Sequence, residues 1–333
     1  MLGQRPAAAV PWFLPPDRVP LRALDDGEAE AENRAVRTAR GAGAGSSPDA
    51  VRPLTAGMRL LLLVGGGLGA IAGTQLFVGT EHTDRFFAWT IQSHMTAAFL
   101  GAMYYSAIPL LVVSATERYW ACARVAAFTL LSVATLVLIA VLAHLDLFHT
   151  DADRTLTMLG TWAFIGTYAV LPVALVAGIW RQLRVPGGDP ARIALLPTWF
   201  RIGLAVQAAI MLSVGAALLI APSATDALWS WELTPLTGRA VGAFVLSTGV
   251  ASALGAREND WTRIRGPIYS YATAAALEFV ALARYSDEVD WESITAWAYV
   301  AFLATALAVG VYGSLAATRS RPVTGNAIAE ASA

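Results

Sequence analysis

The chain has 333 residues, of which 56% are hydrophobic and only 14% are charged. Soluble globular domains carry about a quarter charged residues, so this composition indicates a membrane protein. The formal net charge of -1 gives no electrostatic basis for binding nucleic acid. Cys122 is the single cysteine, which excludes an internal disulfide and a thiolate metal cage. The sequence contains no cofactor motif, and no cofactor is predicted.

Residues 1–52 differ from the rest of the chain, because they are rich in Ala, Pro, Gly, Arg and acidic residues and contain no long apolar run. Such a segment buries too little apolar surface to offset the entropy lost on ordering. Residues 1–52 are therefore predicted to form a disordered cytoplasmic tail. Residues 319–333 are predicted to form a second, shorter cytoplasmic tail.

Between the tails lie eight apolar stretches, each close to the length of about 20 residues that a spanning helix requires. In chain order they are Met58–Phe77, His94–Ser114, Cys122–Leu145, Met158–Trp180, Trp199–Ala221, Pro235–Leu254, Pro267–Tyr285 and Ser293–Leu315. The predicted fold class is an all-α membrane protein with eight transmembrane helices.

The loops between these stretches differ in arginine content. Arg118, Arg184 and Arg263 lie in alternate loops with further arginines, whereas acidic residues dominate loops such as 286–290. Short cytoplasmic loops carry an excess of Arg and Lys, so this pattern places both termini in the cytoplasm. The predicted location is the plasma membrane, in multi-pass form with the lipid bilayer as partner.

The second half of the hydrophobic region repeats features of the first. An offset of 141 residues aligns Glu117, Trp120 and Arg124 with Glu258, Trp261 and Arg265. The offset is 142 near the first span, where Gly73 aligns with Gly215, and 135 near the end, where Trp162 aligns with Trp297. Residues 53–184 and 185–318 are therefore predicted to be two parallel four-helix repeats, since an even number of spans preserves orientation.

Three stretches carry a resemblance to a known group. They are FFAWTI at 86–91, TAAFLGA at 96–102 and WELTPLT at 231–237. In these stretches the chain resembles uncharacterised multi-pass integral membrane proteins of actinobacteria. The resemblance implies a multi-pass topology and brings no activity with it.

Two charged residues lie inside predicted spans, Arg239 in the sixth and Glu278 in the seventh. An ionisable group within the bilayer is costly and marks a functional hypothesis. Their counterparts in the first half, Ala98 and Val137, are uncharged, so we expect Arg239 and Glu278 to pair with each other. The pair forms either a structural link between the two spans or a polar pocket for a solute, to which Gln207 contributes at another depth.

A second candidate site lies at the outer ends of the first four spans. His94, His144, Asp146 and His149 map to this side, and imidazoles brought together bind metal or haem. The spacing matches no strong metal motif. The alternative is a solvated loop with histidines at helix ends.

Three functions remain open from the sequence. The favoured one is a small-solute transporter or permease, supported by the parallel repeats and the charged residues within the spans. The second is a metal or haem redox protein or enzyme that uses the histidine cluster. The third is a non-catalytic membrane subunit or anchor. Neither the solute nor the oligomeric state follows from the sequence.

Overall fold

The computed structural model describes residues 50–152, 154–224 and 229–319. Within these ranges the chain is helical and forms no strand beyond two isolated backbone bridges. Residues 1–49 and 320–333, which hold most of the two predicted tails, lie outside the described residues. The described end of the first tail is attached to a loop, because Arg52 N donates to Gly188 O at 2.9 Å.

Seven helices are long and apolar enough to cross a membrane, as in a multi-pass integral membrane protein. Each coincides with a predicted span. The first spans residues 56–78 and consists of α2 (Ala56–Gly73) and the π-helical turn η1 (Thr74–Val78). The others are α4 (His94–Thr116), α5 (Trp120–Leu142), α6 (Thr155–Leu183), α7 (Thr198–Ile220), α8 (Pro235–Glu258) and α10 (Ile294–Arg319).

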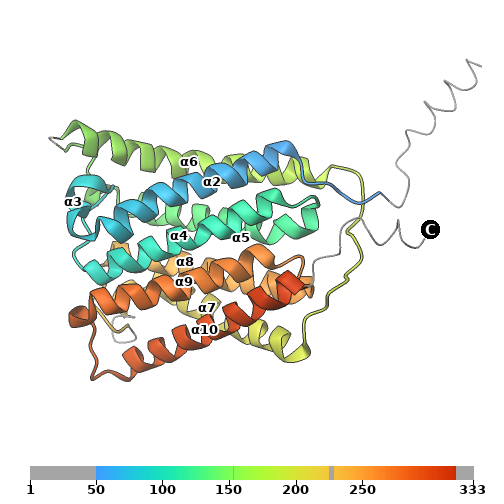
Figure 1. The fold of residues 1–333 in the computed structure, drawn as a ribbon. Helices are drawn as coiled ribbons and strands as arrows, with labels where there is room; N and C mark the ends of the chain where they lie inside the picture. The colour runs from blue at the N-terminus through green and yellow to red at the C-terminus, as the bar shows by residue number, and fades with distance from the viewer. Residues whose placement is uncertain (1–49, 153, 225–228, 320–333) are drawn as a thin grey trace, which may run out of the picture. The chain divides into compact units, whose positions relative to one another are not determined.

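The remaining predicted span coincides with α9 (Arg265–Arg284), a helix of 20 residues. Tyr269, Tyr271 and Glu278 make α9 less apolar than the other long helices, and it is not among the seven. In the bundle α9 lies between α4 and α10 (Figure 1). An eighth span therefore remains a prediction.

Four helices form the inside of the bundle and four lie outside it. Half or more of the apolar stretch is buried in α4 (61%), α5 (50%) and α8 (56%), against 39% in α2, 28% in α6, 22% in α10 and 17% in α7. The fourth inner helix is α9, whose exposed residues are Ala276, Val280, Ala283 and Arg284. Because α4 packs on α9 and α5 packs on α8, the inner helices of the two predicted repeats interleave.

One end of the bundle carries the loops at 117–119, 184–197 and 259–264, and is called the arginine-rich end here (Figure 1). The opposite end carries the other loops. These contain the short helices η2 (Thr80–His82), α3 (Thr83–Phe86), η3 (Leu145–Leu147), η4 (Pro222–Ala224) and η6 (Ser286–Glu288).

Glycines at aligned positions permit the same close helix contacts in both halves. A Cβ atom at Gly101 of α4 would overlap the backbone of Phe77. A Cβ atom at Gly242 of α8 would lie 2.8 Å from Leu218 Cβ and 3.1 Å from the backbone nitrogen of Leu219, the residue aligned with Phe77. Since small residues let helix backbones approach closely, the contact of α4 with η1 and the contact of α8 with α7 have the same basis.

Two ion pairs at the arginine-rich end link the halves in a reciprocal way. Arg265 Nη1 lies 3.0 Å from Glu117 Oε1, and Arg124 Nη2 lies 2.6 Å from Glu258 Oε2. Under the offset of 141 residues the two glutamates are aligned, and so are the two arginines. Each half therefore supplies the same carboxylate and the same guanidinium to the other.

Candidate functional site: a cavity around Glu278

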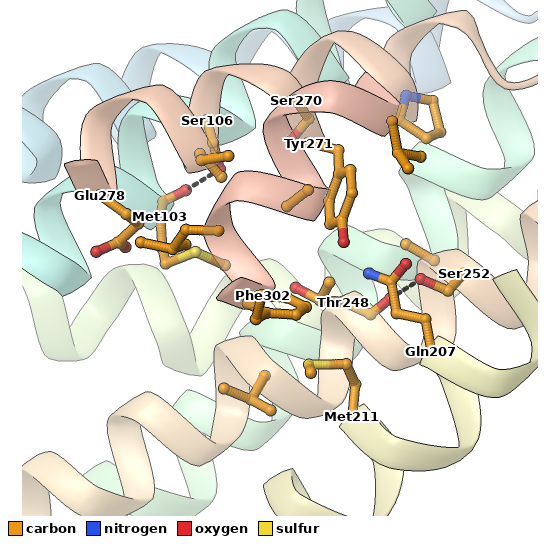
Figure 2. A pocket seen from close by; sticks show the side chains of 18 of the residues that line it. Met103, Ser106, Gln207, Met211, Thr248, Ser252, Ser270, Tyr271, Glu278 and Phe302 are labelled. Atoms are coloured by element: carbon orange, nitrogen blue, oxygen red, sulfur yellow. Dashed lines mark hydrogen bonds between the residues drawn. The ribbon is translucent and has the colours of Figure 1, made fainter. Parts of the chain in front are cut away.

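A cavity of about 390 Å³ lies among α4, α7, α8, α9 and α10 (Figure 2). Its wall is mainly apolar, as is usual for sites that bind small molecules. The polar side chains on the wall are Ser106, Thr129, Gln207, Thr248, Ser252, Ser270, Tyr271, Glu278 and Tyr299, together with the indole of Trp229.

Glu278 is the acidic residue of this wall. Its side chain is buried, with an exposed fraction of 2%. The hydroxyl of Tyr299 on α10 donates to Glu278 Oε2 at 2.9 Å, while Oε1 is buried without a hydrogen-bond partner among the described residues. A buried polar atom without a partner costs free energy, so this oxygen is available to a ligand.

Gln207 and Tyr271 form a second polar region of the same wall. The amide Nε2 of Gln207 is buried without a close partner among the described residues, and Figure 2 shows the Tyr271 hydroxyl pointing toward it. Tyr271 and Glu278 are seven residues apart on α9, which places them about 10 Å apart on one face of the helix. The cavity thus has two polar regions separated by an apolar middle.

The cavity reaches the surface between α7 and α10. Ile210 and Val214 of α7 line it, yet their exposed fractions are 51% and 38%. Ala298 of α10 also lines it and is exposed. The surface at these positions is apolar, so in a bilayer this opening would face hydrocarbon.

The predicted pairing of Arg239 with Glu278 is wrong. Arg239 Nη1 donates to His144 Nε2 at 2.6 Å, and its Nε donates to the carbonyl oxygen of Leu219 at 3.1 Å. Glu278 bonds to Tyr299 instead. Of the three residues predicted to bind a solute, the cavity brings together Glu278 and Gln207 and leaves out Arg239.

The pairing fails because α8 and α9, although consecutive in the chain, are not packed against each other in the bundle. In the structure α8 packs against α7 and α5, whereas α9 packs against α4 and α10. Arg239 therefore faces the ends of α7 and α5, where a helix-terminal carbonyl and an imidazole accept its protons. Partial burial and the charge of Arg239 lower the pKa of His144, which keeps its ring neutral and able to accept.

The histidine cluster does not assemble. His144 bonds to Arg239, His94 Nδ1 lies 2.8 Å from Glu288 Oε1, and His149 bonds to Thr90 and to the carbonyl of Phe87. Asp146, also predicted for this cluster, is exposed on η3. Across the described part of the chain, no group of three His, Cys, Asp or Glu side chains could hold a metal ion.

Glu288 has a structural role that the sequence did not indicate. It accepts hydrogen bonds from Ser93 Oγ at 2.7 Å and from the backbone nitrogens of His94 and Met95 at 3.0 Å. The carboxylate therefore caps the first turn of α4, whose own N-cap is Ser93. Burial raises the pKa of Glu288, but these hydrogen bonds outweigh it and hold the pKa below its usual value.

A buried charge network at the arginine-rich end was also missed. Arg263 Nη1 lies 3.0 Å from Glu258 Oε2, and both side chains have exposed fractions of 3%. Asp260 is fully buried and accepts from the backbone nitrogens of Ile193 and Ala194. These side chains satisfy one another, so the network fixes the loops rather than presenting an open site.

Tyr271 and Tyr299 are among the cavity residues that the sequence analysis did not assign to a site. The repeat offsets carry the signal, because they align Tyr271 with Leu130 and Tyr299 with Phe164. At both positions the second half has a tyrosine hydroxyl where the first half has an apolar side chain.

The chain matches no family model, no curated protein sequence and no solved structure.

Proposed function

We propose that this protein is a small-solute permease of a bacterial plasma membrane and that the cavity around Glu278 is its solute site. One observation carries the proposal. Glu278, which has a buried carboxylate oxygen without a partner among the described residues, lines a cavity of about 390 Å³ inside a bundle of apolar helices.

The cost of such a group within the bilayer supports a functional role. Charged side chains inside transmembrane segments are rare and usually line a pathway or a binding site. In the first half the position aligned with Glu278 is Val137, which is buried without that cost. The scaffold therefore does not need a carboxylate there.

The topology of the proposal has eight spans, with both termini cytoplasmic and two duplicated four-helix units. The reciprocal pairs Glu117–Arg265 and Glu258–Arg124 support the duplication, as do the shared glycine contacts. Counting α9 as a span agrees with its central place between α4 and α10. Arginines at one end of the bundle support a cytoplasmic location of that end.

The two alternative functions have weaker support. The redox hypothesis needs histidines that converge, and each of the three has a separate partner. No contact or surface of the described residues specifically favours a non-catalytic subunit. The resemblance to actinobacterial membrane proteins is a further proposal and concerns topology alone.

The single cysteine makes a labelling experiment direct. In a Cys122→Ser background, Ala275→Cys places a thiol on the cavity wall, and Ala134→Cys places one at the aligned position of the first half. Both alanines are buried, with exposed fractions of 2% and 0%. They differ in that Ala275 lines the cavity.

The reagent is the small membrane-impermeant thiol reagent methanethiosulfonate ethyltrimethylammonium, applied to cells and to inside-out vesicles. A permease should let it reach the thiol of the Ala275→Cys variant from both sides, as mass spectrometry would show, and leave the Ala134→Cys variant unlabelled. Labelling at position 275 from one side only, or from neither, would contradict a permease. Equal labelling of the two variants would show that the reagent reports loosening of the bundle and not the cavity, and would remove this support for the site.

A further inference from the structure

We infer that the solute of this cavity is an organic ammonium compound, with a positively charged amine at one end and an apolar body. The inference rests on the proposed function and specifies the ligand class of the same site. It follows from the charges, the aromatic rings and the separation of the polar groups in the cavity.

The charge of the wall favours a cation. Among the described residues, Glu278 is the single charged side chain that lines the cavity, and the lining includes no Arg, Lys or His. An anionic solute would meet a carboxylate and no counter-charge. An ammonium group would donate to Glu278 Oε1, the oxygen that has no partner, and would form a charge-assisted hydrogen bond.

The carboxylate is held in place for this contact. The Tyr299 hydroxyl donates to Oε2 at 2.9 Å, which leaves Oε1 as the oxygen that is available to a ligand. The ring of Tyr299 packs on Trp231, with centroids 5.3 Å apart, and this packing fixes the tyrosine. A cation that binds Oε1 therefore meets a carboxylate whose orientation Tyr299 already fixes.

Aromatic rings line the same region of the wall. Phe99 and Trp229 pack edge to face, with ring centroids 6.0 Å apart, and both line the cavity together with Phe302. Aromatic faces attract cations, and the attraction grows when water is excluded. An inorganic cation would gain little from such a wall, whereas an alkylammonium gains from the rings and from the carboxylate.

The apolar middle of the cavity sets the rest of the ligand. Met103 and Phe302 lie between Glu278 and the Tyr271–Gln207 region, and Met211 lies beside Gln207 (Figure 2). The distance of about 10 Å between the two polar regions matches a ring carried on a short alkyl chain. The opening beside Ile210 and Val214 faces hydrocarbon, so a ligand that partitions into lipid has access to the site.

Three probes that share one body and differ in the end group test this inference. They are 4-phenylbutylamine, 4-phenylbutanol and 4-phenylbutyrate. Binding is measured on the purified full chain in lipid nanodiscs by radioligand equilibrium, with the alcohol controlling for partition into lipid. We expect the amine to bind about tenfold or more tightly than the alcohol, the size of one charge-assisted hydrogen bond, and the butyrate to bind weakest.

Variants assign the effect to the cavity. Glu278→Gln should abolish the preference for the amine over the alcohol, and Tyr299→Phe should reduce it. Glu288→Gln removes a carboxylate that lies outside the cavity, on the loop after α9, and should leave the preference unchanged. If Glu278→Gln does not fold, dicyclohexylcarbodiimide modification of Glu278 in the unmodified chain replaces it, and the amine should slow that modification where the alcohol does not.

The outcomes separate this inference from the proposed function. If the three probes bind equally, or if none protects Glu278, while the Ala275→Cys variant is labelled from both sides, the ammonium inference is wrong and the permease proposal stands. If the amine binds with the expected preference but that variant is labelled from one side only, the ligand class stands and transport is wrong. If no probe binds and the introduced thiol is not labelled, both proposals are overturned.

Discussion

Residues 53–184 and residues 185–318 use equivalent helix contacts but fill the space between their helices differently. In the first half, a Cβ atom at Gly65 of α2 would lie 2.8 Å from the Leu130 side chain of α5, so the two helices are tightly packed there. The aligned residues of the second half are Gln207 and Tyr271, which line the cavity. A close apolar contact in one half corresponds to a pair of polar groups in the other.

The same difference recurs near Glu278. Trp89 packs on Phe164 in the first half, with ring centroids 5.7 Å apart, and the aligned Trp231 packs on Tyr299 at 5.3 Å. The aromatic contact is shared, and the second half adds a hydroxyl that bonds to Glu278. The second half thus has polar groups at positions where the first half packs apolar side chains.

Glycines on the outer helices α6 and α10 lie at close contacts with neighbouring helices. A Cβ atom at Gly178 of α6 would lie 2.6 Å from Leu61 of α2, so α6 packs against α2. A Cβ atom at Gly310 of α10 would lie 2.8 Å from Ala272 of α9. In both halves the last helix packs on an inner neighbour, α6 on α5 and α10 on α9.

The largest expected effect concerns the reciprocal ion pairs. Glu258→Ala should lower the free energy of unfolding by about 3–5 kcal/mol, because it removes the buried carboxylate that Arg124 and the buried Arg263 share and leaves them the more exposed Asp189. Glu117→Ala should cost less, since the side chains of Glu117 and Arg265 keep exposed fractions of 19% and 18%. Thermal or denaturant unfolding in detergent measures both.

Glu81→Ala is the control for these variants, because Glu81 is exposed on η2. Its effect should stay within about 0.5 kcal/mol. The reciprocal arrangement would be irrelevant to stability if all three variants unfolded at the same temperature as the unmodified chain.

The next effect concerns the shared glycine contacts. Gly101→Ala and Gly242→Ala should each destabilise the bundle by about 1–3 kcal/mol, since the added methyl group overlaps the neighbouring helix. Gly160→Ala on α6 meets open space and should be neutral or slightly stabilising. Melting temperatures of the three variants check this. If Gly101→Ala lowers the melting temperature and Gly242→Ala does not, the two glycine contacts are not equivalent.

Sequence reasoning succeeded where the signal is local. The length of an apolar stretch is local, so all eight predicted spans coincide with helices, and seven of these helices are apolar enough to cross a membrane. Glu278 and Gln207 were identified because a polar residue within an apolar stretch is visible in the sequence. Both line the cavity.

Sequence reasoning failed where the answer depends on which helices meet. Arg239 was paired with Glu278 because their helices are consecutive, whereas the interleaved packing brings Arg239 to His144. Glu288 was one acidic loop residue among several, and its cap on α4 depends on a contact between residues 195 positions apart. Such partners follow from the packing of the bundle, which no local pattern specifies.

A third prediction converts the cavity toward its apolar counterpart. The double variant Glu278→Val with Tyr299→Phe introduces the residues found at the aligned positions Val137 and Phe164. It should raise the stability by about 1–2 kcal/mol, because it removes a buried acceptor without a partner and leaves no hydroxyl unpaired. Differential scanning fluorimetry measures the change. A loss of stability would mean that the polar pair holds the second half together and is not an addition to the scaffold.

The smallest effect concerns the caps of the two aligned inner helices. The start of α4 is capped by Glu288 of the other half, whereas the start of α8 is capped by its own Thr234 and Thr237. Glu288→Ala and Thr234→Ala should each cost about 1 kcal/mol at pH 7. The two losses should differ in their dependence on pH, because Glu288 is ionisable and threonine is not.

The sign of that dependence follows from the hydrogen bonds to Glu288. Burial alone would raise its pKa, but the backbone N–H groups and the Ser93 hydroxyl stabilise the charged form and hold the folded pKa below the usual 4.5. Its contribution is therefore complete above pH 4.5 and decreases as the pH falls through the folded pKa. Unfolding of the Glu288→Ala variant should converge with that of the unmodified chain below that pH, while the deficit of Thr234→Ala persists. A deficit of Glu288→Ala that stays constant in acid would mean that its charge does not act on α4.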